Sequence, residues 1–205
     1  MSRKGMFRGI LLTAFFLVSC GVEPEKRAYP LAVTLDVRDG RYEAGFGMGD
    51  LSALTGQGKA EKEEKELQIY TGDTLKEVRE DYSRSQQYYL DTGHVQAVLL
   101  GEGFLEEEAF LEQALAEMED NRMLGSGCYV FSCKEPEVFL KLDGSEVDSL
   151  VEYLAGVYKN RPSDQREDAV TLQEVYTAWH DRGELPPLPA VTLGENQKIL
   201  VDNPD

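Results

Sequence analysis

Apolar side chains recur at every second position over residues 31–35 and again over residues 42–46. A period of two is typical of a strand with one buried face. Between the two runs, Arg38-Asp39-Gly40 supplies a turn, because glycine adopts a positive φ without strain. We therefore predict an N-terminal β-hairpin. Residues 47–66 are rich in glycine and charge and show no periodicity, which predicts an irregular surface loop.

Strands and helices then alternate along the middle of the chain. Thr74 and Glu77 form the sequence pattern of a capping box, so a helix is expected to begin there. Its apolar stripe continues to Tyr89, and Gly93 is placed to end the helix in a left-handed cap. The predicted elements are a strand at 67–72, a helix at 74–93, a strand at 94–102, a helix at 106–120 and a strand at 127–133.

The last third of the chain is more helical. Capping patterns predict one helix after Ser145, with Asp148, and another after Thr171, with Glu174. Residues 185–201 then predict a short strand, a turn and a last apolar strand. The alternation indicates an α+β fold, in which a mixed β-sheet with an N-terminal hairpin carries packed helices in a single domain.

The first 19 residues have a different character. Residues 10–18 are apolar except for Thr13, and three basic residues and no acidic residue precede them. A spanning helix needs about 20 apolar residues, so this run is too short to cross a bilayer. A basic start followed by a short apolar run is typical of a secretory signal peptide. We therefore interpret residues 1–19 as a signal that is removed.

Cys20 follows the apolar run directly. Leu17-Val18-Ser19-Cys20 resembles the lipobox of bacterial lipoproteins, in which a diacylglycerol is attached to the thiol and the signal is cut before the cysteine. Acyl chains such as palmitate bury methylene groups in the bilayer at about 0.8 kcal/mol each, so two or more chains make a stable anchor. We therefore predict lipidation of Cys20, a lipidated tether over residues 20–27 and an α/β domain over residues 28–205 on the extracytoplasmic face of the cell membrane.

Charge narrows the possible partners of this domain. The whole chain holds 21 basic and 38 acidic residues, and residues 1–19 account for three of the basic ones, which leaves a net charge of −20 after removal of the signal. Binding to nucleic acid requires a basic surface. The balance therefore argues against nucleic acid as a partner, and it gives no attraction to anionic lipid, so that the acyl chains have to hold the protein at the membrane.

The remaining cysteines and the two histidines give little sign of a reactive site. Cys128 and Cys133 are five residues apart in a predicted strand, where their Cα atoms would lie roughly 16 Å apart and face opposite ways, too far for a disulfide. We expect two free thiols, with at least one buried. His94 and His180 have no second ligand at metal spacing. We expect His94 at a strand start and His180 near a helix end, and no metal site or cofactor.

Three short matches to known motifs are better explained as structure. Asp91-Thr92-Gly93 is the core of the aspartic-protease signature, but its context reads as a helix end with a glycine cap. The glycines of residues 45–49 are not followed by a helix, as a dinucleotide loop requires. Residues 56–59 lack the Ser or Thr of a phosphate-binding loop, because Ala60 stands there. We therefore expect no catalytic constellation.

Several segments together resemble a known family. They are the lipobox, the hairpin ending in an Asp near its turn, "TGQGK", the strand from His94 to Glu102 with its Leu-Leu-Gly-Glu end, and the closing "LPPLPAVTL". This set is similar to the first domain of the Ger(x)C lipoproteins, the C subunits of nutrient germinant receptors in spore-forming bacteria. Gly21-Val22 replaces the family's usual Trp-Asp, and the chain is much shorter than typical members, as expected of a short relative or a fragment.

The resemblance implies a non-enzymatic subunit on the outer face of the spore inner membrane, acting in germination with two multi-span membrane subunits. Two alternatives stay open from the residues alone, an unrelated surface lipoprotein that captures a small solute and an anchored hydrolase. A solute binder should show a deep pocket. A hydrolase should show convergent groups with perturbed pKa values in a cleft. A receptor subunit should show instead an exposed surface for its partners.

Overall fold

The computed structural model describes residues 22–48, 68–142, 150–160, 162, 169–195 and 198–202. The predicted signal over residues 1–19, the lipidation candidate Cys20, most of the predicted loop at 47–66 and the cap at Ser145 lie outside the described residues. In the described part of the chain, no helix is long and apolar enough to span a bilayer.

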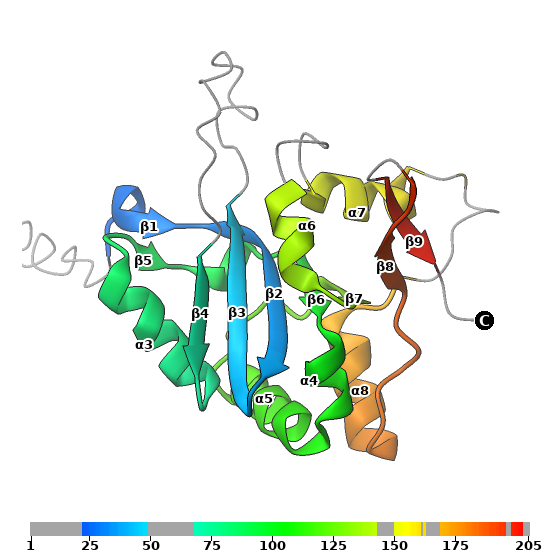
Figure 1. Cartoon of the computed structure of the whole chain (residues 1–205), viewed down its shortest axis with the longest axis horizontal. Helices are drawn as coiled ribbons and strands as arrows, with labels where there is room; N and C mark the ends of the chain where they lie inside the picture. The colour runs from blue at the N-terminus through cyan, green and yellow to red at the C-terminus, as the bar shows by residue number, and fades with distance from the viewer. Residues whose placement is uncertain are drawn as a thin grey trace, which may run out of the picture.

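A seven-stranded mixed sheet forms the centre of the fold (Figure 1), in the order β4-β3-β2-β6-β7-β8-β9. The four strands β2, β6, β7 and β8 run parallel to one another, and antiparallel pairing adds β3 and β4 at one edge and β9 at the other. The strands are β2 (Pro30–Arg38), β3 (Arg41–Met48), β4 (Ile69–Gly72), β6 (Ala97–Leu100), β7 (Tyr129–Ser132), β8 (Ala190–Leu193) and β9 (Ile199–Asp202).

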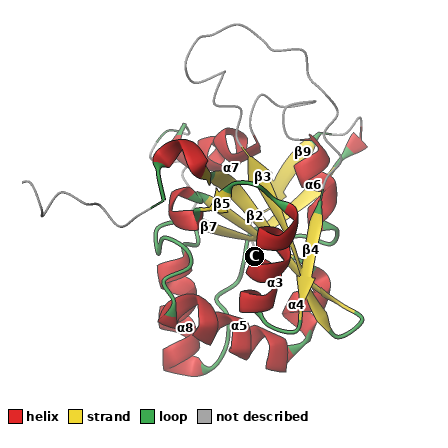
Figure 2. Cartoon of the chain, turned by 90° about the vertical axis from the view of Figure 1, so that its left-hand side faces the viewer, coloured by secondary structure: helices red, strands yellow, loops and turns green. Residues whose placement is uncertain are grey.

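Helices cover both faces of this sheet (Figures 1 and 2), so each face has its own apolar core. One core joins the sheet to α3, α4, α5 and α8, and the other joins it to α6 and α7. The helices are α3 (Leu75–Ser85), α4 (Glu102–Glu106), α5 (Glu108–Asp120), α6 (Pro136–Leu142), α7 (Leu150–Lys159) and α8 (Leu172–Arg182). The prediction of a single α+β domain with a mixed sheet is confirmed.

The N-terminal hairpin is also confirmed. Strands β2 and β3 pair in antiparallel register from Val33–Phe46 to Arg38–Arg41, and Asp39 and Gly40 both take a positive φ at the turn. The alternating pattern predicted a strand with only one buried face. Strand β2 instead lies between β3 and β6 and is buried on both faces. Thr34 and Asp36 are therefore buried polar residues in the middle of the sheet.

The long helix predicted over residues 74–93 is wrong in its second half. Helix α3 ends at Ser85, whose hydroxyl donates back to the carbonyl oxygens of Asp81 and Tyr82, and the chain then becomes extended at Gln86. Tyr89–Leu90 forms strand β5, which pairs in parallel with β1 (Arg27–Ala28). Thr92–His94 forms a 3-10 turn, η3. Pairing with a segment about 60 residues earlier in the chain replaces the local helix.

Other local predictions hold with small changes. The capping box of Thr171 and Glu174 is present, and α8 ends at Gly183 with φ 69°. The helix predicted at 106–120 corresponds to α5, which the separate short helix α4 precedes. The last two predicted strands form the β8–β9 hairpin. Cys128 and Cys133 are free and buried, and they lie in the two different cores, as their predicted opposite orientation requires.

Candidate functional site

The carboxylate of Asp36 is buried and accepts hydrogen bonds from three residues. Its Oδ1 accepts from the backbone N–H of Val37 at 2.9 Å and of Phe104 at 3.1 Å, and its Oδ2 accepts from Nε of Arg38 at 3.4 Å. Helix α4 begins after Gly101, which has no side chain to cap it. Asp36 therefore supplies from β2 the cap that the start of α4 lacks.

Two glycines let α4 approach this carboxylate. A Cβ at Gly101 would lie 2.2 Å from the carboxyl carbon of Asp36, and a Cβ at Gly103 would lie 2.2 Å from the carbonyl oxygen of Val37. Both distances are far inside van der Waals contact, so a side chain at either position would push α4 off the hairpin. Neither glycine has a positive φ. It is therefore the close approach of α4 to the hairpin, and not the backbone conformation, that requires glycine at these two positions.

Charged groups surround this junction without forming a reactive cluster. Arg38 pairs with Glu137 at 2.7 Å and with Glu43 at 3.6 Å. Burial raises the pKa of Glu43, although the charge of Arg38 opposes the rise. Burial also raises the pKa of the Cys133 thiol, and the charges of Asp36 and Glu137 add to it, so this cysteine is neutral and a poor nucleophile. The arrangement fixes the hairpin to α4 and to the start of α6.

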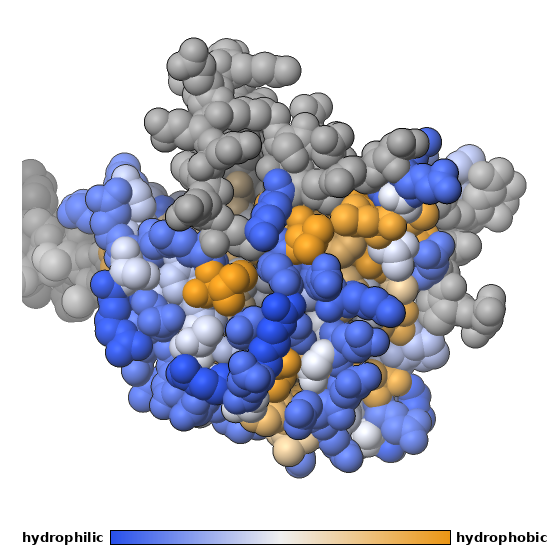
Figure 3. All heavy atoms as spheres, viewed as in Figure 1, coloured by the Kyte–Doolittle hydropathy of each residue, from blue (hydrophilic) through white to orange (hydrophobic). Residues whose placement is uncertain are grey.

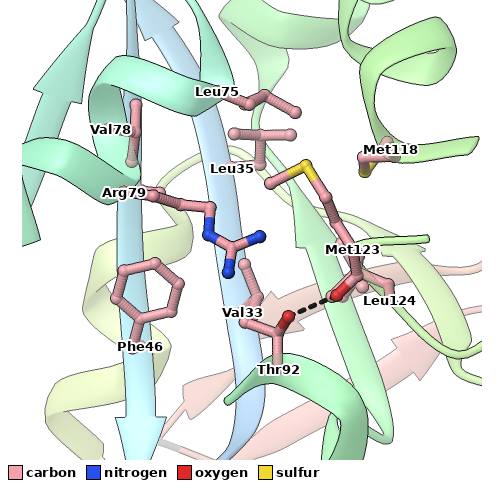
Figure 4. A pocket seen from close by; sticks show the side chains of 12 residues that line it. Val33, Leu35, Phe46, Leu75, Val78, Arg79, Thr92, Met118, Met123 and Leu124 are labelled. Atoms are coloured by element: carbon pink, nitrogen blue, oxygen red, sulfur yellow. Dashed lines mark hydrogen bonds between the residues drawn. The ribbon is translucent and has the colours of Figure 1, made fainter. Parts of the chain in front are cut away.

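An apolar pocket lies on the other side of the hairpin, between the sheet, α3 and the chain after α5 (Figure 4). Its walls come from Val33, Phe46, Val78, Met118 and Met123, among others. The Arg79 side chain extends across the pocket toward Thr92, whose hydroxyl donates to the carbonyl oxygen of Met123.

The size of this pocket limits what it can hold. Its volume is about 40 Å³. A cavity of roughly 150 Å³ accommodates benzene, and pockets for larger ligands measure about 300–1,000 Å³. The pocket therefore has room for a water molecule or a few methyl groups. It is not the deep pocket expected of a solute-binding lipoprotein.

A third feature joins the first described residues to the domain, and we call it the N-terminal clasp: Val22 to Ala28 held against Tyr89 to His94. Arg27 donates to the carbonyl oxygen of Val22 at 2.9 and 2.7 Å and to Oδ2 of Asp91 at 2.8 Å. The backbone N–H of Asp91 donates to the carbonyl oxygen of Ala28 at 2.9 Å. The Arg27 hydrogen bond, helped by the N–H of Gly93, lowers the pKa of Asp91.

Aromatic side chains border the clasp. Tyr29 packs edge-on against His94 with ring centroids 5.0 Å apart, and its hydroxyl donates to the carbonyl oxygen of Pro24. Tyr88 and Tyr89 are 46% and 50% exposed, and Val22 is 40% exposed. Two other exposed apolar residues, Leu193 and Leu200, lie on the β8–β9 hairpin at one edge of the seven-stranded sheet. Hydrophobic residues also reach the surface in several places in Figure 3, most widely at the upper right.

The structure places the sequence candidates apart from one another. His94 lies in the η3 turn and not, as predicted, at the start of a strand, because β6 begins at Ala97. Asp91-Thr92-Gly93 follows strand β5, but its carboxylate is paired with Arg27 and belongs to the clasp. His180 lies in the last turn of α8, as predicted, and its Nε2 is 2.9 Å from Oε2 of Glu119. Within the described ranges, no three His, Cys, Asp or Glu residues are grouped so that they could hold a metal ion.

Sequence reasoning missed the clasp and the role of Asp36. Asp36 lies within the predicted hairpin, but its partner, Phe104, is 68 residues away. Arg27 and Asp91 are 64 residues apart. A local signal was the Tyr88-Tyr89 pair, two adjacent aromatic residues that the structure leaves about half exposed, with Tyr88 just before β5 and Tyr89 at its start.

Comparison with known protein families gives a match over most of the chain. The family model described as the spore germination protein N-terminal domain matches residues 21–193. This range covers the clasp, the hairpin–α4 junction, one core and all of the other core except the part that β9 supplies, Ile199 and Val201. No curated protein and no solved structure matches the chain.

Proposed function

Because the chain belongs to the family of spore germination protein N-terminal domains, we propose that it is a lipid-anchored, non-enzymatic subunit of a spore nutrient germinant receptor. The observation that carries the proposal is the position of the family match, which begins at residue 21, directly after the lipobox cysteine. A germination domain joined to an acylated Cys20 would act at a membrane surface.

The arrangement of polar groups supports a role without catalysis. The buried carboxylate of Asp36 is committed to backbone and Arg38 donors, and Asp91 is committed to Arg27. The buried thiol of Cys128 has its pKa raised to about 12 by burial, so it is protonated at neutral pH. The titratable groups described above are thus occupied in holding the fold. They do not converge on a cleft where a substrate could lie.

The partners we propose are multi-span membrane subunits that sense nutrients in the spore inner membrane. An anchor confines the domain to a thin layer beside the bilayer and so raises its effective concentration near membrane proteins. A weak contact is then sufficient, and a large apolar patch is not required. The net charge of −20 after signal removal favours a basic surface on the partner and an association rate that falls with salt.

The anchor is tested by mass spectrometry of the mature protein. We expect the N-terminal residue to be an acylated Cys20, and we expect Cys20→Ala to leave the signal uncut and the protein without acyl chains. Cys128→Ala is the matched control, because that thiol is buried in the core and should have no part in acylation. A mature chain that begins at another residue would contradict the anchor.

The receptor assignment is tested by purification from detergent-solubilised spore membranes. We expect the wild-type chain to co-purify with multi-span subunits, and the Cys20→Ala chain to recover far less of them at equal input. Wild-type protein that is acylated but recovers no membrane partner would contradict the receptor proposal while leaving the anchor intact.

A further inference from the structure

We propose that Val22, Tyr88 and Tyr89, which we call the tyrosine face, lie on the lipid headgroups and fix how the domain is oriented on the membrane. The inference rests on the acylation of Cys20 proposed above. It adds a lipid-contacting surface and a defined orientation, which an acyl anchor alone does not provide.

The distance from the anchor to this face is short. Val22 is two residues after Cys20, and a fully extended chain spans at most about 3.3–3.6 Å per residue. The Cα atom of Val22 can therefore be no more than roughly 7 Å from that of the acylated cysteine. A flexible tether of several residues would let the domain turn freely, but here the described structure begins almost at the anchor.

Because the clasp bonds Val22 to the domain, the short distance between Cys20 and Val22 also limits how far the domain can lie from the anchor. Arg27 holds the carbonyl oxygen of Val22 with two hydrogen bonds, and the same guanidinium pairs with Asp91. Strand β1 pairs with β5, with Arg27 opposite Tyr89. A membrane that holds Cys20 must therefore lie close to Val22 and to the β1–β5 pair, where Tyr89 is 50% exposed.

The side chains on this face suit a lipid interface. Tyrosine has an apolar ring and a polar hydroxyl, and it is enriched at the depth of the headgroups in membrane proteins. Local charge offers no alternative attraction, because Lys26 is paired with Glu23 at 2.7 Å and Arg27 is paired with Asp91. We therefore expect contact through the tyrosine rings, with little dependence on anionic lipid.

The proposed orientation places the far side of the domain toward water and toward partners. In Figure 1, β1 and β5 lie at the upper left and α8 at the lower right. The exposed residues just after α8, such as Glu184, would then be distant from lipid.

Spin-label accessibility measures this orientation on the acylated full chain in phosphatidylcholine vesicles. One nitroxide is placed at Gln87→Cys, beside both tyrosines, and one at Glu184→Cys. Cys128 and Cys133 are buried, and an acylated Cys20 has no free thiol, so the introduced cysteine takes the label. We expect several-fold less collision with a water-soluble nickel chelate at position 87 than at position 184, and the same ratio when phosphatidylglycerol is added.

Substitutions then test whether the tyrosine rings contact the lipid or whether this face only lies near the membrane because Cys20 is anchored there. Tyr88→Ser/Tyr89→Ser should bring the two collision rates close together, and the matched exposed pair Leu193→Ser/Leu200→Ser should leave their ratio unchanged. Equal rates in wild type, or a ratio that the tyrosine variant does not change, would overturn the inference when mass spectrometry shows acylated Cys20. An unmodified Cys20 would overturn the proposed anchor and this inference together.

Discussion

Asp36 accepts a hydrogen bond from the backbone N–H of Phe104 at 3.1 Å, although the two residues are 68 positions apart. The bond joins the hairpin to the start of α4, and it passes beside Gly101, where a Cβ would lie 2.2 Å from the carboxyl carbon. Two segments that carried the resemblance in the sequence, the hairpin and the strand with its Leu-Leu-Gly-Glu end, therefore meet in space. Their shared role is to hold the sheet and α4 together.

Removal of the Asp36 carboxylate should destabilise the domain. Asp36→Ala leaves the N–H of Phe104 without its acceptor in a buried site and also opens a small void, which together should cost about 2–4 kcal/mol. Urea unfolding followed by circular dichroism measures the change. Asp181→Ala on the exposed face of α8 is the control and should change the free energy of unfolding by less than about 0.5 kcal/mol. Equal effects of the two substitutions would contradict the capping role.

Gly101→Ala should be destabilising through a steric clash with Asp36. We expect a loss of about 2–3 kcal/mol, since a well-packed junction cannot accept a methyl group. Because the clash is with the carboxylate, Gly101→Ala/Asp36→Ala should cost clearly less than the sum of the single changes. Gly125→Ala, where a Cβ would meet nothing within 4 Å, is the control. Additive effects in the double variant would show that the clash lies elsewhere.

Local patterns in the sequence were sufficient for much of this fold. The alternation of apolar residues predicted the hairpin, and Thr171 with Glu174 predicted the start of α8, because both signals lie within a few neighbouring residues. The orientation of Cys128 and Cys133 into different cores followed from the period of a strand.

Features made by distant residues could not be predicted in this way. Helix α3 ends at Ser85 although the apolar stripe continues, because Tyr89–Leu90 pairs with Arg27–Ala28. The clasp and the Asp36 cap depend on the same kind of long-range contact. The first residues after the predicted cleavage site read as a plain polar tether, but from Val22 onward they are bonded to the domain through Arg27.

The two buried thiols should make the domain less stable in alkali. Burial raises the pKa of Cys128 to about 12 and also raises that of Cys133, whereas an unfolded thiol titrates near about 8.5. The unfolded chain therefore loses these protons first, so the stability that the neutral thiols provide is complete below pH ~8.5 and declines above it. Each thiol can contribute up to about 1.4 kcal/mol per pH unit.

Urea unfolding between about pH 8.5 and 10, below the usual range of tyrosine titration, measures this slope. Cys128→Ala/Cys133→Ala should be less stable at pH 7 but should show a flatter decline over the same interval. An unchanged slope in the double variant would mean that other groups cause the alkaline destabilisation.

The N-terminal clasp should open in acid. The pKa of Asp91 is lowered chiefly by its hydrogen bond to Arg27, so the stability that this pair provides is present above the unfolded value of about 3.9 and is lost as the pH falls through the lower folded value. At neutral pH, Asp91→Asn should mimic this loss and speed hydrogen exchange at its own backbone N–H, which donates to Ala28.

The core amides should report whether this opening is local. In Asp91→Asn, exchange at Leu99 in the central strand β6 should stay as slow as in wild type. Glu23→Gln removes the exposed pair with Lys26 and should leave the clasp amides nearly unchanged, since exposed ion pairs contribute little. Equal exchange at residue 91 in wild type and Asp91→Asn would contradict the clasp.

The central claim, a membrane-anchored subunit that acts in germination, is tested most directly by nutrient-triggered germination of spores that carry no other member of the family. Spores with the wild-type gene should lose optical density after nutrient addition, and spores with a deleted gene or with Cys20→Ala should respond much more slowly, at equal spore yield and heat resistance. Deletion spores that respond to nutrients as fast as wild-type spores would contradict the account.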